Sequence, residues 1–299
     1  MERNLMDFKE FTEEVKRSLE KMADENTEVV VEERLKNNGL KLMGVSMLQK
    51  GETVSPVVYM EPFYKHYKEG NCTLHGAVEK IEGILNEHSG HTELGASVED
   101  FGNWDSVRTR IFAKLINADM NRELLQRVPN RMFLDLAVVY YVKVQDFSDG
   151  AGTILVDDRH LQLWDADETM LYETALFNME TDGICFQGME EILLEAGRGS
   201  LPAPSGMYVL TNRTKLFGAS ELVRSDILHR IAGMLQDNLV ILPSSIHEVI
   251  VLPEKEAPSE QEAAEMVKEV NASELAPEEI LSNHVYRFDR GRDEVCIAA

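Results

Sequence analysis

The spacing of apolar residues near the N-terminus predicts a helix. Phe8, Phe11, Val15 and Leu19 follow one another at steps of three and four, with glutamate and lysine between them. Side chains at these steps share one face of a helix. The pattern therefore predicts an amphipathic helix over residues 5–22.

The pattern then changes to one that is typical of β-strands. The runs EVVVEERL and LKLMGVSML flank Asn37-Asn38-Gly39, whose residues tolerate positive φ and favour a hairpin. A third strand, TVSPVVYM, follows. Thr73 is the expected N-cap of a helix over 73–88, which Gly90 would end. Together these elements predict an N-terminal α+β domain over residues 1–92.

A second domain is predicted over residues 93–253, after a polar linker at 93–104. Val107, Ile111 and Leu115 are spaced for a helix over 105–128. MFLDLAVVYYVKV is apolar on both faces, as expected of a buried central strand, and it turns through QDFSDGAG into TILV.

The rest of this domain continues as helices and strands. Asp165 and Glu168 fit a capping box that opens the helix ETMLYETALFNM, and a short helix, MEEILLEA, ends at Gly197. GMYVLTN, NLVILP and EVIVLP are expected strands, with the helix SDILHRIAGMLQ before the second and EVIVLP closing the sheet. The fold class is therefore α+β with a mixed or antiparallel sheet.

Residues 254–299 change in composition. Up to residue 283 the segment is rich in glutamate and short of large apolar residues, so we expect a solvated helix and a mobile, partly disordered acidic tail. Its end, HVYRFDRGRDEVCI, alternates apolar and polar residues and predicts a short strand. This strand would dock on the body or add to a partner's sheet edge.

Charge and cysteine content narrow the classes of function. The chain has 30 basic and 53 acidic residues, a net charge of −23, which repels phosphate backbones and makes a nucleic-acid partner unfavourable. Three scattered cysteines are not a disulfide framework. The chain shows neither a signal peptide nor an apolar run long enough to span a membrane, so we expect a cytoplasmic protein without membrane association.

The stretch ILPSSIHEVIVLP raises the question of nucleophilic catalysis, because Ser245 and His247 stand two residues apart. On a strand, His247 and Glu248 point to opposite faces, so this glutamate cannot orient the imidazole. The alternatives are a turn at Pro243-Ser244-Ser245 or a capping box from Ser245 to Glu248. We predict a structural turn, and keep Ser245 and His247 as weak catalytic candidates.

Metal sites are not expected. Cys72 and His75 form one half-site and His88 and His91 another, but the intervening helix separates them by roughly 20 Å, too far for one zinc ion. The acidic residues between Asp157 and Glu168 lack the glycine and glutamate of an EF-hand. We therefore expect no metal and no cofactor.

One segment departs from the acidic average. Residues 106–131 carry six basic side chains against Asp119 and Glu123. Four of them define a candidate anion or partner patch on the predicted helix: Arg108, Arg110, Lys114 and Arg122. The alternative is that these side chains pair with the chain's own carboxylates.

Several stretches along the chain form a recognisable set: LKNNGLKLMGVSM, KLINADMNRELLQRVPNRMFLDLAVVYY, YVLTNRTKLFGA, ILPSSIHEVIVLP and VNASELAPEEILSNHVYRFDR. Together they resemble the uncharacterised domain-of-unknown-function family 5688 of gut anaerobic bacteria. The resemblance runs along most of the chain and implies no activity.

Three hypotheses about function follow. The first is a non-catalytic cytosolic binding or adaptor protein, whose partner protein would bind the acidic tail or the basic helix. The second is a hydrolase that uses Ser245 and His247. The third is a nucleic-acid-associated factor that uses residues 106–131.

Overall fold

The computed structural model describes residues 5–50, 55–89, 101–147, 150–195, 197 and 206–298. The chain forms two compact units. Unit 1 comprises residues 1–36 and 40–101, and unit 2 comprises residues 37–39 and 102–299. The predicted boundary near residue 92 lies outside the described residues, as does most of the predicted linker.

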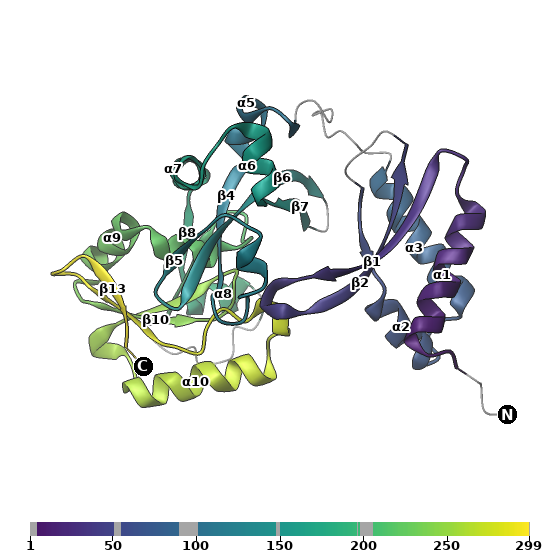
Figure 1. Ribbon diagram of the computed structural model, residues 1–299. Helices are drawn as coiled ribbons and strands as arrows, with labels where there is room; N and C mark the ends of the chain where they lie inside the picture. The colour runs from purple at the N-terminus through teal and green to yellow at the C-terminus, as the bar shows by residue number, and fades with distance from the viewer. Residues whose placement is uncertain are drawn as a thin grey trace. The chain divides into compact units, whose positions relative to one another are not determined.

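Unit 1 is a three-stranded antiparallel sheet packed against helices (Figure 1). Its elements are α1 (Phe8–Met22), β1 (Thr27–Leu35), β2 (Lys41–Gln49), β3 (Val58–Tyr59), α2 (Glu61–Lys68) and α3 (Leu74–Ser89). The N-terminal stripe is buried as predicted, and Phe11, Val15 and Leu19 pack with Val45 and Ile81 in one core. Helix α2 was not predicted.

The hairpin signal in the sequence is confirmed. Strands β1 and β2 pair from Thr27 with Gln49 to Leu35 with Lys41. Between them Asn38 has φ 59° and Gly39 has φ 70°. Asparagine and glycine tolerate this left-handed region best, so local chemistry fixes the register of the hairpin.

Unit 2 contains a four-stranded antiparallel sheet. Its strands are β4 (Ile111–Asn117), β5 (Asn130–Phe133), β6 (Leu136–Phe147) and β7 (Gly150–Leu155). The long strand β6 is central, because β4 pairs with one edge and β5 and β7 pair with successive parts of the other. The predicted single strand MFLDLAVVYYVKV is divided by a turn at Leu134-Asp135, and Leu134 has φ 57° there.

The predicted helix over 105–128 is wrong. Only Trp104–Val107 is α-helical (α5); a 3-10 turn, η2 (Arg108–Arg110), follows and leads into β4, and a second 3-10 turn, η3 (Leu124–Gln126), lies further on. Ile111 and Leu115 are four residues apart, which fits a helix face and equally one face of a strand. Pairing of Ile111–Asn117 with β6 selects the strand over the helix, because non-local contacts override local spacing.

Two helices follow β7. They are α6 (Asp158–Trp164), which was not predicted, and α7 (Glu168–Asp182). The predicted capping box from Asp165 to Glu168 is wrong, because Asp165 ends α6 in the left-handed conformation. The side chain of Asp167 instead caps α7 by accepting a hydrogen bond from the Met170 N–H.

A six-stranded antiparallel sheet completes unit 2, in the order β13-β12-β10-β11-β9-β8. The strands are β8 (Ile184–Gly188), β9 (Tyr208–Asn212), β10 (Leu239–Pro243), β11 (Val249–Pro253), β12 (Tyr286–Asp289) and β13 (Glu294–Ile297). The helical elements between β8 and β10 are α8 (Met189–Glu195), η4 (Gly218–Val223) and α9 (Ser225–Leu235). EVIVLP is β11, which lies inside the sheet and does not close it. The predicted α+β class with antiparallel sheets is confirmed.

The C-terminal segment differs from the predicted mobile tail. After the turn η5 (Glu254–Glu256), helix α10 (Glu260–Ser273) buries Ala263 and Val267 against Leu242 and Leu252 of the sheet (Figure 1). The predicted strand in HVYRFDR is β12, which pairs with β10. Few large apolar residues are enough here, because small side chains let α10 lie close to the sheet.

The segment that joins α10 to β12 contains a 3-10 turn, η6 (Pro277–Glu279), and six of its carbonyl groups are held by distant donors. Each of the six consecutive carbonyl oxygens from Pro277 to Ser282 accepts a hydrogen bond. Five of these bonds come from side-chain amides of asparagines, and the Ile246 N–H donates the sixth, to Glu279. The donors are Asn37, Asn38 (twice), Asn117 and Asn271. These bonds replace the ladder that a strand or helix would supply.

Candidate functional site

Ser245 and His247 lie in the connection between β10 and β11. The Ser245 N–H donates to the Glu248 carbonyl (3.1 Å), and the Ser245 hydroxyl accepts from the His247 N–H (3.0 Å). The serine side chain is buried and is bonded to the histidine backbone, not to its ring. These contacts form the structural turn that the sequence predicted.

The imidazole of His247 is also engaged elsewhere. Its Nδ1 accepts a hydrogen bond from the Phe217 N–H (3.1 Å), and the two rings stack at 5.3 Å. Burial lowers the pKa of His247, and the nearby Lys114 charge acts in the same direction. The neutral imidazole of His247 can accept the hydrogen bond from the Phe217 N–H at Nδ1, and this bond fixes the loop that leads into η4.

We expect Ser245→Ala to lower the free energy of unfolding by about 0.5–2 kcal/mol, because the turn loses its side-chain acceptor. Chemical denaturation measures this change. A fluorophosphonate probe should not label Ser245 in the wild-type protein. Labelling that disappears in His247→Ala would contradict the turn and support the hydrolase hypothesis.

A second Ser-x-His pair has a carboxylate that the sequence did not reveal. The Ser282 hydroxyl donates to Asp135 Oδ2 (2.7 Å), and Nδ1 of His284 lies 3.0 Å from the same oxygen. The Tyr286 hydroxyl donates to the other carboxylate oxygen (2.8 Å). Ser282 is buried, and its hydroxyl lies closer to the acid (2.7 Å) than to His284 Nδ1 (3.4 Å). In a nucleophilic triad the serine and the acid bond to different nitrogens of the imidazole, whereas here both meet Nδ1. The cluster therefore ties the segment before β12 to the β5–β6 turn.

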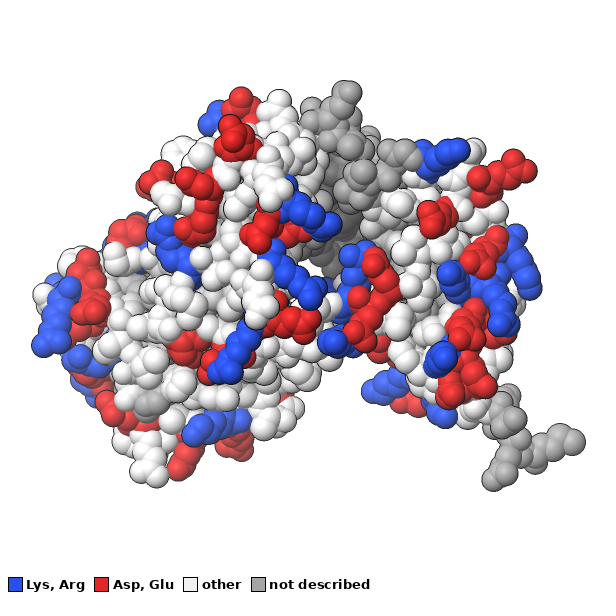
Figure 2. All heavy atoms as spheres, viewed as in Figure 1, with Lys and Arg blue, Asp and Glu red and all other residues white. Residues whose placement is uncertain are grey.

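The candidate basic patch is not on one helix. Arg108 is in η2 and pairs with Asp105 (3.2 Å), Arg122 is in a turn and pairs with Asp119 (2.8 Å), and Lys114 on β4 lies 4.1 Å from the centre of the Phe217 ring. Arg110 donates to the Ser106 carbonyl (3.3 Å). On the face seen in Figure 2, positive and negative side chains are interspersed. The alternative of pairing with the chain's own carboxylates accounts for Arg108 and Arg122.

The suspected metal ligands are not gathered in the part of the chain that the structure describes. No group of three or more histidine, cysteine, aspartate or glutamate side chains there could hold an ion. Cys72 lies near the Phe63 carbonyl and His75 pairs with Glu79 (3.4 Å), while His91 and the side chain of His88 are outside the described residues. In the acidic run, Asp157 caps α6.

No described helix is long and apolar enough to cross a bilayer.

Helix α7 has apolar residues on two opposite faces. Its inner face buries Leu171, Ala175 and Met179. Its opposite face carries an outer stripe, which we define as Met170, Glu173, Phe177 and Glu180 at steps of three and four; all four side chains are exposed. A surface helix normally has one apolar face, so exposed apolar side chains on the other face make this stripe a candidate contact surface. ETMLYETALFNM shows this pattern in the sequence, where we read it only as a helix.

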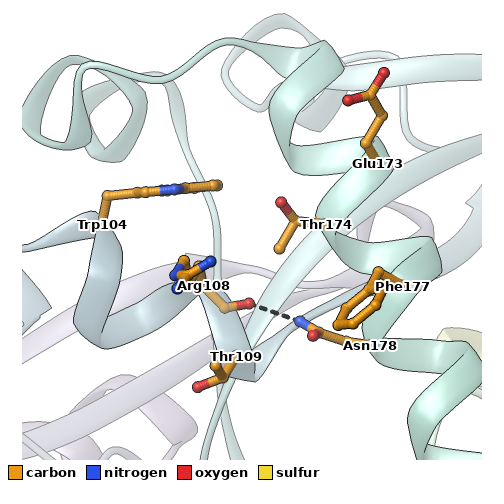
Figure 3. Close-up of a pocket in the computed structure, with 7 residues that line it drawn as sticks. All are labelled: Trp104, Arg108, Thr109, Glu173, Thr174, Phe177 and Asn178. Carbon is orange, nitrogen blue, oxygen red and sulfur yellow. Dashed lines mark hydrogen bonds between the residues drawn. The ribbon is translucent and has the colours of Figure 1, made fainter.

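A hollow of about 370 Å³ adjoins the outer stripe (Figure 3). Trp104 and Arg108 line it from α5 and η2, and Glu173 and Phe177 line it from α7. The side-chain amide of Asn178 holds the two walls together, because it donates to the carbonyls of Arg108 (2.6 Å) and Ile111 (2.8 Å). Its volume falls within the range of ligand pockets, and it is large enough for a partner's side chain.

Phe177 is the most exposed aromatic residue of this hollow. Its side chain is 67% exposed at the edge of the hollow, whereas Trp104 contacts the buried Trp164 with ring centres 6.2 Å apart. Aromatic residues at such edges are frequent anchors in protein interfaces. The lining of the hollow thus includes two aromatic rings, one partly buried and one exposed.

A buried acid lies elsewhere in unit 2. Glu221 of η4 has no exposed surface, and burial raises its pKa to about 7 against the opposing charge of Arg224, whose Nη1 is 3.4 Å away. Within the described residues, its Oε1 has no hydrogen-bond partner. The folded chain therefore binds a proton at this carboxyl group more tightly than the unfolded chain does.

Comparison with known families places the chain in one of them. A family model described as a family of unknown function, DUF5688, matches residues 8–290. No curated protein matches the chain, and no solved structure matches it.

Proposed function

Because the chain belongs to this family of unknown function, we propose a function from its own surface: it is a non-catalytic protein that binds another protein through the outer stripe of α7 and the hollow beside it. The observation that supports this proposal is Phe177, an aromatic side chain 67% exposed beside a hollow on a well-packed helix. Leaving such a side chain in water forgoes about 1.5–3 kcal/mol of burial free energy, which a partner would recover.

The hollow favours a protein partner over a small molecule. It is lined on one wall by a helix whose contact residues extend beyond it, from Met170 to Glu180. A surface of this shape suits a partner that places one apolar side chain in the hollow beside Trp104 and Phe177 and contacts the remainder of the helix.

The three cysteines, Cys72, Cys185 and Cys296, carry free thiols. Free thiols support our proposal that the protein is cytoplasmic.

Site-specific crosslinking tests the proposal. A photo-crosslinking amino acid is placed at position 177 or, as a control, at position 234 of α9, where Met234 is 66% exposed. We expect a discrete crosslinked protein from the native cells only with position 177. The purified partner should then bind Phe177→Ala at least tenfold more weakly than wild type, and Met234→Ala with unchanged affinity.

Two outcomes contradict the proposal. One is equal crosslinking from both positions, which indicates non-specific contact. The other is a partner whose affinity is the same for wild type and Phe177→Ala.

A further inference from the structure

Charges on the outer stripe limit the kind of partner that it fits, if the proposed function holds. Glu173 and Glu180 lie before and after Phe177 on the same face of α7, at steps of four and three residues. Both glutamate side chains are exposed, and neither forms an ion pair with a described residue. Helix α7 contains no lysine or arginine at all. The stripe therefore presents an apolar anchor between two negative charges.

Two basic side chains beside α7 already have carboxylate partners. Arg108 lines the same hollow, but its guanidinium pairs with Asp105 at 3.2 Å. Arg131 pairs with Glu168 at the start of α7 and lies over the Tyr172 ring, 3.9 Å from its centre, so its charge already has a carboxylate partner outside the stripe. Together with the net charge of −23, the surface around Phe177 attracts a cationic partner.

The spacing of the two glutamates indicates the partner's secondary structure. Seven residues of helix separate them, a rise of about 10 Å. On an extended strand, side chains on one face are spaced by about 6.6 or 13 Å, so two of them do not match this interval. On a helix, residues i and i+7 share a face at about 10 Å, and residues i+3 and i+4 lie between them.

We propose that the outer stripe binds a basic amphipathic helix of a partner protein. This helix carries lysine or arginine at positions i and i+7, which face Glu173 and Glu180, and an apolar side chain at i+3 or i+4, which enters the hollow beside Phe177. It lies alongside α7 at the shallow crossing angle that is common for packed helices.

Two synthetic helices of about 20 residues test the inference against the full-length protein. The patterned peptide is alanine-based, with lysines at i and i+7 and leucines at i+3 and i+4. The control has the same composition, with one lysine moved to the opposite face. Fluorescence anisotropy should show at least tenfold tighter binding of the patterned peptide, weakened when salt rises from about 0.05 to about 0.5 M.

Matched charge reversals identify the surface. Glu173→Lys combined with Glu180→Lys should weaken binding of the patterned peptide at least tenfold. Glu265→Lys combined with Glu269→Lys makes the same charge change on exposed positions of α10 and should leave most of the affinity.

The results separate this inference from the proposed function. Equal binding of both peptides, equal effects of both double variants, or no binding of the patterned peptide overturns the basic helix. Each of these leaves the proposed function in place if crosslinking still depends on position 177. Binding that Phe177→Ala does not weaken overturns the docking of any helix in the hollow.

Discussion

Phe288→Ala is expected to lower the free energy of unfolding by about 3–5 kcal/mol, because it empties a large buried site in the six-stranded sheet. Phe288 of β12 is fully buried and pairs with Leu239 of β10 on one side and Val295 of β13 on the other. Chemical denaturation measures the loss.

The control for this change is Phe177→Ala. Its side chain is mostly exposed, so the stability should change by no more than about 0.5 kcal/mol. A loss below about 1 kcal/mol for Phe288→Ala would mean that the segment after Pro253 is not part of the core.

The second large effect concerns the pH dependence of stability. Burial raises the pKa of Glu221 from 4.5 to about 7, so the folded state binds this proton more tightly than the unfolded state. The resulting stabilisation is fully present below the unfolded pKa and is lost as the pH rises through 7. Between about pH 5 and pH 8 the wild-type protein should lose about 2–3 kcal/mol through this group.

Glu221→Gln removes the titration and keeps the shape of the side chain. Its unfolding free energy should fall about 2–3 kcal/mol less than that of the wild type over the same pH interval. Arg224 keeps a partner in the variant, because its guanidinium also pairs with Asp226 at 3.1 Å. Glu265→Gln, on an exposed face of α10, should follow the wild-type curve. Parallel curves for wild type and Glu221→Gln would show that the carboxyl group is ionised in the folded state.

Elements with strong local signals were predictable from the sequence. The β1–β2 hairpin follows from Asn38 and Gly39, which occupy the left-handed region that the turn requires. The helical stripe of α1 follows from its spacing. Both depend on neighbours in sequence, which is the information that local patterns contain.

Elements that depend on distant contacts were not predictable in the same way. Ile111 and Leu115 are compatible with a helix and with a strand, and only pairing with β6 selects β4. Asp135 is 147 residues from Ser282, so no motif links them. The outer stripe of α7 was visible as apolar residues all around the helix, but which face is buried depends on how β4 packs against it.

One of the asparagine amides that bind residues 277–282, that of Asn38, is also prone to slow deamidation. Asn38 precedes Gly39, and an asparagine followed by glycine is prone to spontaneous deamidation. The unhindered glycine nitrogen attacks the side-chain carbonyl carbon, ammonia leaves, and water then opens the cyclic imide to give a carboxylate. The product at position 38 carries a carboxylate where an N–H group had donated to the carbonyls of Pro277 and Ile280. Two attractive contacts then become repulsive ones. Protein that has been stored should therefore lose the hydrogen bonds from residue 38 to this segment, although its gene is unchanged. A mass increase of about one unit in the peptide that spans the turn would reveal the change.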